Sequence, residues 1–220
     1  MSSIRLFLSR VQLAVFSLLL VCSAGMAAPA LGEQGAAPAC EASAAEVKRV
    51  KAENLAGAPI YFVKSSEEDR ARGIEAYVKT ARYRAALSKN ALLFDVKSQG
   101  AASRPAFELI FAGADMPAGL ELTEPQSGRV SYFTGRDPAH WRRAVQTYRS
   151  AVYRGAYAGI DVRVYGRGDR LEYDFMAAPG SDPARIELAY GAGAAARINS
   201  QGDIEYDLGG AVLVQKRPEA

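Results

Sequence analysis

From about residue 59 onward, apolar residues recur at every second position in short runs, which Phe107, Leu109 and Phe111 show clearly. Such alternation is typical of strands with one buried face, and breaks rich in Gly, Pro, Ser or charge separate the runs. The expected strands are 59–64, 74–79, 83–87, 91–96, 106–111, 120–123, 129–133, 148–153, 160–165, 171–177, 186–190, 196–199, 204–208 and 211–216. No helix between them is long enough for a parallel crossover. The pattern therefore predicts a mainly β fold, an antiparallel β-sandwich or open barrel of about a dozen short strands.

Helical signals are few. Asp137 followed by Pro138 has the form of an N-cap and a first helical residue, so one short helical turn is expected from there through Trp141 to about Val145. A narrow apolar face also allows a short helix over 44–54.

The first residues have the features of an export signal. Arg5 and Arg10 precede an apolar run from Val11 to Val21, and small residues follow. We expect a signal peptide over 1–28, a flexible leader over 29–56 and a β-sandwich-like domain over 57–220. The run is shorter than the roughly 20 residues of a spanning helix, so no stable transmembrane span is expected after cleavage. The alternatives are an uncleaved anchor and a lipoprotein attached through Cys22.

Charge and cysteine content narrow the function classes. Lys and Arg number 27 against 24 acids, and removing the signal lowers the basic count to 25, so the exported chain is nearly neutral. No nucleic-acid partner is expected. Cys40 would remain alone, either free or paired between chains, and together with His140 it cannot form a common four-ligand zinc site.

The hairpin over 160–177 can be assigned a register from its apolar positions. A turn centred between Arg167 and Gly168 pairs Val164 with Leu171, Val162 with Tyr173, Ile160 with Phe175, Arg163 with Glu172, and Asp161 with Asp174. This register turns Tyr173 inward and Glu172 outward. It also makes Asp161 and Asp174 two facing carboxylates.

The acids of this hairpin are the candidate chemistry. Asp161, Asp174 and Glu172 would suit a glycosidase-like acid/base pair, and Asp161 and Asp174 would also suit calcium, although no EF-hand-type loop is present. The structural alternative is that Asp137 caps a helix and Asp182 begins a turn, while Asp161 and Asp174 bond turn amides or pair with Arg143, Arg149 or Arg163. No catalytic nucleophile is recognisable, so we expect no enzyme and no cofactor other than a possible calcium ion.

Two further patterns have a functional and a structural interpretation. Arg167-Gly168-Asp169 spells an integrin-recognition tripeptide, but Gly and Asp also suit a tight turn. A series of aromatic residues would suit either a sugar-binding face or core packing. The series is Tyr132, Phe133, Trp141, Tyr148, Tyr153, Tyr157 and Tyr165.

About two-thirds of the sequence, most densely residues 131–182, resembles a bacterial domain of unknown function that stands at the N-terminus of exported cell-surface proteins with SBBP-type beta-propeller repeats. The resemblance rests on 132–138 (YFTGRDP), Trp141, Tyr148, 152–153, Tyr157, 159–161 (GID), 165–166, 171–175 (LEYDF), 178–180 (APG) and 182–183. It implies a β-rich exported module without a known activity. Ala158 and Ser131 depart from the pattern, and the charged run 67–70 looks like an insertion.

Two functions of different classes follow. The favoured one is an exported, non-catalytic envelope or secreted module, located in the periplasm, at the cell surface or outside the cell, which acts through protein or glycan contacts. The rival is a small carboxylate-dependent hydrolase, or a calcium-binding module, that uses the Asp161/Asp174 region.

Overall fold

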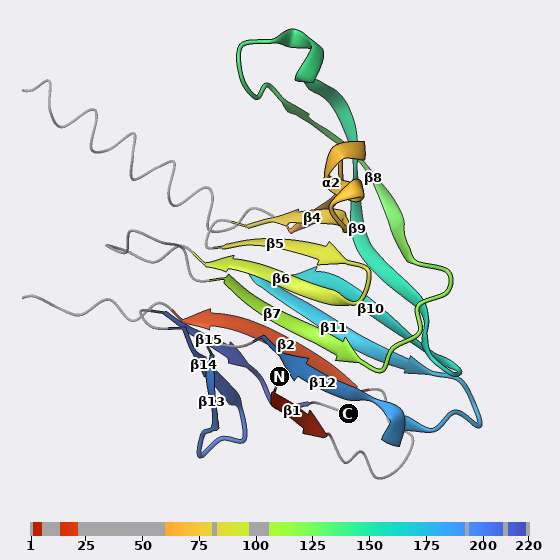
Figure 1. The fold of residues 1–220 in the computed structure, drawn as a ribbon, viewed down its shortest axis with the longest axis vertical. Coiled ribbons are helices and arrows are strands. Elements are labelled where there is room, and N and C mark those ends of the chain that lie inside the picture. The colour runs from red at the N-terminus through yellow and green to blue at the C-terminus, as the bar shows by residue number, and fades with distance from the viewer. Residues whose placement is uncertain are drawn as a thin grey trace, which may run out of the picture.

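Strands dominate the computed structural model, which describes residues 2–5, 14–21, 60–80, 83–96, 106–191, 194–208 and 211–218. They form one antiparallel sheet that curls into a half-barrel, as Figure 1 shows. The strand order is β1-β12-β7-β6-β5-β4-β3-β9-β10-β11-β2-β15-β14-β13, and β8 pairs with β9 outside this path. The predicted mainly β class and its open-barrel form are confirmed.

The elements of the first half run from β1 to β7. They are β1 (Ser2–Arg5), β2 (Ala14–Val21), β3 (Tyr61–Lys64), α2 (Glu67–Ala71), β4 (Ile74–Lys79), β5 (Tyr83–Ser88), β6 (Ala91–Val96) and β7 (Ala106–Ala112). The second half comprises β8 (Leu120–Tyr132), η1 (Pro138–His140), β9 (Arg142–Tyr157), β10 (Ile160–Arg167), β11 (Arg170–Ala177), η2 (Pro183–Arg185), β12 (Glu187–Tyr190), β13 (Ala195–Ile198), β14 (Ile204–Asp207) and β15 (Val212–Gln215).

The largest departures from the predicted elements are around β8 and β9. These strands have 13 and 16 residues and pair with each other, so the helical turn ends at His140 instead of continuing toward Val145. Their ladder extends past irregular points because Glu124 and Ala144 adopt positive φ angles of 58° and 50°. The alternation of apolar residues is broken there, and the sequence pattern therefore predicted shorter strands.

One helix was not predicted. The charged run interpreted as an insertion forms α2, which begins where the Ser66 Oγ accepts a hydrogen bond from the Asp69 N–H at 3.1 Å. Three acids lie in its first turn, where the helix dipole favours negative charge.

The core lies inside the curled sheet and is rich in aromatic rings. Phe111 makes edge-to-face contacts with Tyr153, Tyr173 and Phe175, at centroid distances of 5.5, 6.0 and 6.1 Å. The hydroxyl of Tyr153 donates a hydrogen bond of 2.9 Å to the Ser88 carbonyl, which satisfies its one polar group. Burial of such rings supplies most of the stabilisation of a β domain.

The predicted register of the β10–β11 hairpin is wrong by two residues. Val162 lies opposite Phe175 and Val164 opposite Tyr173, while Arg163 faces Asp174. The turn is Gly168-Asp169, with Gly168 at a φ of +62°, a conformation that glycine adopts without strain. A slip of two residues leaves every side chain on the same face, so the alternation of apolar residues alone cannot detect it.

The inward face of the hairpin was predicted correctly, whereas the outward face was not. Tyr173 is fully buried, as expected. Glu172, expected to be exposed, retains only 2% of its accessible surface, and Asp174 retains 8%. The outer face of β11 is therefore covered, and Glu172 is a buried acid.

Some predictions lie outside the described residues. These include the possible helix over 44–54, Cys22 and Cys40. The segments 2–5 and 14–21 are described as strands, and the signal peptide itself stays a prediction. Over the described part of the chain, no helix has the length and apolar character needed to cross a membrane.

Candidate functional site

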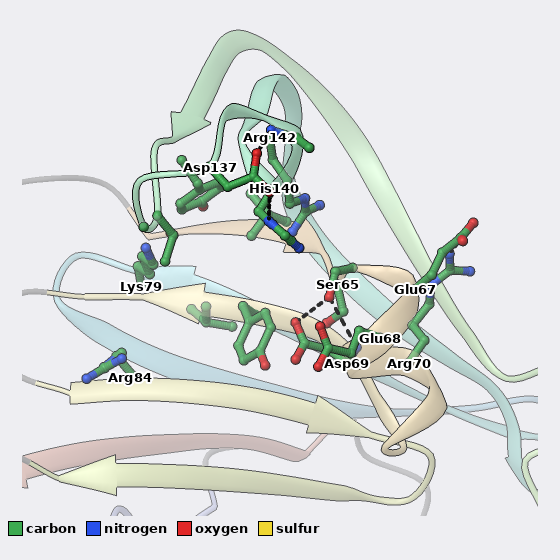
Figure 2. Close-up of a pocket in the computed structure, with 18 of the residues that line it drawn as sticks. Ser65, Glu67, Glu68, Asp69, Arg70, Lys79, Arg84, Asp137, His140 and Arg142 are labelled. Carbon is green, nitrogen blue, oxygen red and sulfur yellow. Dashed lines mark hydrogen bonds and ion pairs between the residues drawn. The ribbon is translucent and has the colours of Figure 1, made fainter.

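A cavity of about 1120 Å³ lies between α2, the β4–β5 strands and the connection from β8 to β9 (Figure 2). Its lining comes from segments far apart in the sequence. The lining residues are Val63, Ser65, Ser66, Glu67, Glu68, Asp69, Arg70, Tyr77, Val78, Lys79, Arg84, Tyr132, Thr134, Gly135, Arg136, Asp137, Ala139, His140 and Arg142. This volume is slightly above the range of about 300–1,000 Å³ that is typical of small-molecule sites.

The wall formed by the β8–β9 connection is fixed by local sequence. The Asp137 carboxylate accepts a hydrogen bond of 2.9 Å from the Ala139 N–H, and Pro138 follows it at the first position of η1. His140 Nδ1 lies 3.1 Å from the other Asp137 oxygen. The N-cap predicted at Asp137 is thus confirmed, and it holds His140 against the cavity.

The acids of the cavity all have partners within the protein. Glu67 and Glu68 pair with Arg70 and Arg72, at 3.8 and 2.7 Å. Asp69 accepts a hydrogen bond of 2.6 Å from the Ser66 hydroxyl. Together with the pairing of Asp137, this leaves no lining carboxylate without a hydrogen bond or an ion pair.

Three cations of the cavity lining have no carboxylate partner among the described residues. Among the described residues, no carboxylate oxygen lies within 4.0 Å of Lys79, Arg136 or Arg142. Arg142 donates a hydrogen bond of 2.6 Å to the Lys64 carbonyl, which is a neutral acceptor. Arg84 reaches Asp95 at 3.7 Å. The cavity therefore has paired acids and unpaired cations, an arrangement that favours an anionic ligand.

Lys79 contacts an aromatic ring of the cavity wall. Its Nζ lies 4.2 Å from the centroid of the Tyr132 ring, within the range of a cation–π contact. Arg84 stands directly opposite Lys79 across β4 and β5. Burial, and then the charge of Arg84, lowers the pKa of the Lys79 ammonium. Two like charges on opposed positions repel, and Arg84 has a carboxylate partner in Asp95 whereas Lys79 has none among the described residues.

Three buried polar atoms in residues of the cavity wall have no hydrogen-bond partner. They are the Ser65 Oγ, the Tyr132 hydroxyl and the Arg70 Nε. All three can donate, and leaving a buried donor unsatisfied costs about 1–3 kcal/mol. Each of these atoms is buried, so the three donors lie within the wall and not on the surface that a ligand in the cavity would contact.

An aromatic pair, of which Phe133 is exposed and Trp141 is half-buried, lies beside the cavity on the same connection. Phe133 is 62% exposed and makes an edge-to-face contact with Trp141 at 5.2 Å. The Arg143 guanidinium lies 5.5 Å from the Trp141 ring. Phe133 follows Tyr132 directly and precedes Thr134, both of which line the cavity. A flat, exposed ring next to a polar cavity is a common arrangement for holding a sugar.

This connection belongs to the part of the chain that comparison with protein families recognises. Residues 62–220 match a domain of unknown function, DUF7948. The chain belongs to this family. No curated protein and no solved structure matches it. Every lining residue of the cavity falls within the DUF7948 match.

The acids singled out from the sequence lie elsewhere in the DUF7948 domain, on the β10–β11 hairpin. Asp161 is opposite Met176, not Asp174, so the two carboxylates do not face each other. Asp161 accepts hydrogen bonds of 2.9 Å from the Arg154 guanidinium and 2.7 Å from the Gly155 N–H. The predicted pair of opposed carboxylates is therefore absent.

Glu172 and Asp174 nevertheless share one face of β11, two residues apart. The Tyr165 hydroxyl donates a hydrogen bond of 3.3 Å to Asp174, and Arg167 lies 4.0 Å from Glu172. Burial raises the pKa of Asp174 and also, with the charge of Asp174, that of the Tyr165 phenol. Neither acid is among the residues that line the described cavity. The described residues contain no group of three or more His, Cys, Asp and Glu side chains placed to hold a metal ion.

The remaining sequence candidates are dispersed. Arg167 and Gly168 are exposed at the hairpin tip. Asp182 caps the short 3-10 helix η2 through a hydrogen bond of 3.1 Å from the Ala184 N–H, where the structural alternative predicted a turn. The aromatic series does not form one face, because Tyr153 and Tyr157 are core residues whereas Phe133 is exposed.

Sequence analysis missed the residues that give the cavity its positive charge. Lys79 ends β4 and Arg142 begins β9, and each resembles an ordinary surface charge at the end of a strand. The only signal was the YFTGRDP segment, which supplies several lining residues but was used to recognise the family and not to locate a site.

Proposed function

We propose that this chain is a non-catalytic binding module of the bacterial envelope, or a secreted one, and that its cavity holds an acidic sugar residue of a glycan. The observation that carries the proposal is the unequal pairing of charge in the cavity. Glu67, Glu68 and Asp69 have partners, whereas Lys79 and Arg142 have no carboxylate partner in the described part of the chain.

A sugar acid fits the other polar groups as well. Its carboxylate would contact Lys79 and Arg142, which both lie near the Tyr132 ring. Its hydroxyls would donate to acceptors such as Asp69 and Asp137. Phe133 offers an exposed ring at the border for the next sugar of the chain. Sites that bind a polar ligand usually combine a few convergent polar groups with an aromatic surface.

Export and domain context belong to the same proposal. The charged start and apolar run of the N-terminus support secretion, periplasmic location or display at the cell surface. The resemblance to domains that precede SBBP-type propeller repeats supports a role as the N-terminal module of a surface protein. A glycan contact outside the cytoplasm is consistent with both.

Calorimetric titration with oligogalacturonate, and with galactose oligomers of the same length, tests the cavity. We expect binding of the acidic oligomer alone, weakened at least tenfold by Lys79→Gln combined with Arg142→Gln. Lys89→Gln, which removes an exposed charge outside the cavity, is the matched control and should bind normally. Equal affinity for both oligomers, or binding that the double variant leaves unchanged, would refute the proposed site.

The same samples also test whether the protein is a hydrolase or binds calcium. Release of new reducing ends that Asp174→Asn abolishes would favour a hydrolase using Asp161, Glu172 and Asp174. A rise in the melting temperature on adding calcium, lost in Asp161→Asn or Asp174→Asn, would favour a metal site. We expect neither.

A further inference from the structure

Strand β2 alone connects two parts of the sheet. Its residues Ala14–Leu18 pair with β11 over Leu171–Phe175, and Leu18–Val21 pair with β15 over Val212–Gln215. Both pairings are antiparallel, and the strand order places β2 directly between β11 and β15. Among the described strands, β11 and β15 make no pairing with each other.

The strand in this place is the apolar run that the sequence predicts to be a signal peptide. Cleavage after about residue 28 would remove β2 from the exported chain. The edges of β11 and β15 would then present unpaired backbone N–H and C=O groups toward the same gap. Unpaired edges of this kind are templates for adding a strand.

The walls of the gap also specify the side chains that fit. Positions 16 and 18 of β2 stand opposite Tyr173 and Leu171, and position 20 stands opposite Leu213. All three of these partners are at most 1% exposed and belong to the core. Directly opposed residues share a face, so an occupant must be apolar at every second position.

We propose that the gap between β11 and β15 is a strand-acceptor slot, which an extended apolar segment of a separate polypeptide enters after the signal peptide has been removed. The inference goes beyond the glycan site and rests only on the proposed export. The entering strand pairs its backbone with both edges and places alternate apolar side chains against Tyr173, Leu171 and Leu213. A second copy is a poor donor, because the exported copy has lost the same apolar run.

Hydrogen exchange on the protein purified after export tests the slot. Intact mass first establishes the N-terminus. A synthetic peptide with the sequence of residues 14–21, flanked by lysines for solubility, is then added. We expect exchange at least tenfold slower in 171–175 and 212–215, together with a higher melting temperature. A control peptide with Asp at the positions of Phe16, Leu18 and Leu20 should change neither.

Two results would overturn the proposal. Mass showing that residues 1–28 are retained would mean that β2 is a permanent strand of this chain. Full protection of 171–175 and 212–215 without peptide, and no response to it, would mean that the exported chain closes the gap itself. Sugar binding at the cavity is measured separately, so neither result is confused with failure of the glycan site.

Discussion

Asp174 lies opposite Arg163 across the β10–β11 pair and accepts a hydrogen bond of 3.3 Å from the Tyr165 hydroxyl. Despite these favourable contacts, its pKa is raised, because the cost of burying the charge is the larger effect. Arg163 does not cancel this cost, since its guanidinium is bound to Glu124. Asp174 is therefore an acid whose ionised form opposes folding.

Replacing Asp174 with Asn should raise the free energy of unfolding at pH 7 by a few tenths to about 1 kcal/mol. An acid with a raised pKa destabilises the fold at every pH above its folded pKa. The penalty shrinks as pH falls through that value and vanishes below the unfolded pKa of about 3.9. Urea denaturation from pH 7 to pH 3.5 measures this as a difference from the wild type that disappears at the acid end.

Asp161→Asn is the control on the same hairpin. Asp161 binds the Arg154 guanidinium and the Gly155 N–H, so its replacement should lower stability at pH 7 by about 0.5–1.5 kcal/mol. If both variants were stabilised to the same degree, mutual repulsion between Asp161 and Asp174 would be the better explanation, and the observed register would be in doubt.

Asp203 should respond to pH in the opposite direction. It is buried, accepts a hydrogen bond of 2.8 Å from Lys216, and receives the Arg217 N–H at 3.0 Å. The bond from Lys216 is the main reason why its pKa is lowered. Its stabilisation is therefore complete above the unfolded pKa and is lost as pH falls through the lower, folded value.

We expect Asp203→Asn to lower the free energy of unfolding at pH 7 by roughly 1–3 kcal/mol, and the loss to shrink toward pH 2. The same urea series, extended from pH 3.5 down to pH 2, measures this variant. An Asp203→Asn protein as stable as the wild type at pH 7 would contradict the role assigned to the Lys216 contact.

Alternation of apolar residues sufficed to predict most of this fold, because a curled antiparallel sheet with one buried face imposes that pattern on each strand. It predicted that Tyr173 points inward, and the structure confirms it. The exact partner across the hairpin could not be predicted, since a shift of two residues preserves both faces and only the turn residues distinguish the alternatives.

The candidate site could not be predicted for a different reason. Lys79 and Arg142 come from β4 and β9, which lie on either side of β3, and what they share is the Tyr132 ring of β8, whose centroid lies 4.2 Å from Lys79 and 5.8 Å from Arg142. No local pattern records that proximity. Glu172 was misassigned because a charged residue on an outward position is normally exposed, and its burial depends on tertiary contacts.

Replacing Tyr173 with Asp should abolish cooperative folding, whereas Tyr173→Phe should keep it. Tyr173 is fully buried and its ring packs on Phe111 and Phe175, so an unpaired carboxylate there costs several kcal/mol. Phenylalanine preserves these ring contacts. Far-UV circular dichroism with thermal melting distinguishes the two outcomes, and a soluble, cooperatively melting Tyr173→Asp protein would show that the core face is misassigned.

Ala144 offers a test of the long β8–β9 pair that forms one wall of the cavity. Its φ of 50° places a side chain in the left-handed region, while its N–H donates a hydrogen bond of 3.0 Å to the Ser131 hydroxyl. Such a conformation costs a non-glycine residue about 1–2 kcal/mol. Because Ala144 is exposed, removing its methyl group loses almost no buried surface.

Ala144→Gly should therefore raise the free energy of unfolding, by up to about 1 kcal/mol after the added freedom of the unfolded chain is counted. Ala151→Gly is the matched control in the same strand, because Ala151 is fully buried and has no positive φ. It should destabilise the domain by about 1 kcal/mol, since it removes a packed methyl group and adds backbone freedom. Chemical denaturation measures the free energy of unfolding of both variants. Equal losses of stability in the two would show that the backbone at Ala144 is not strained.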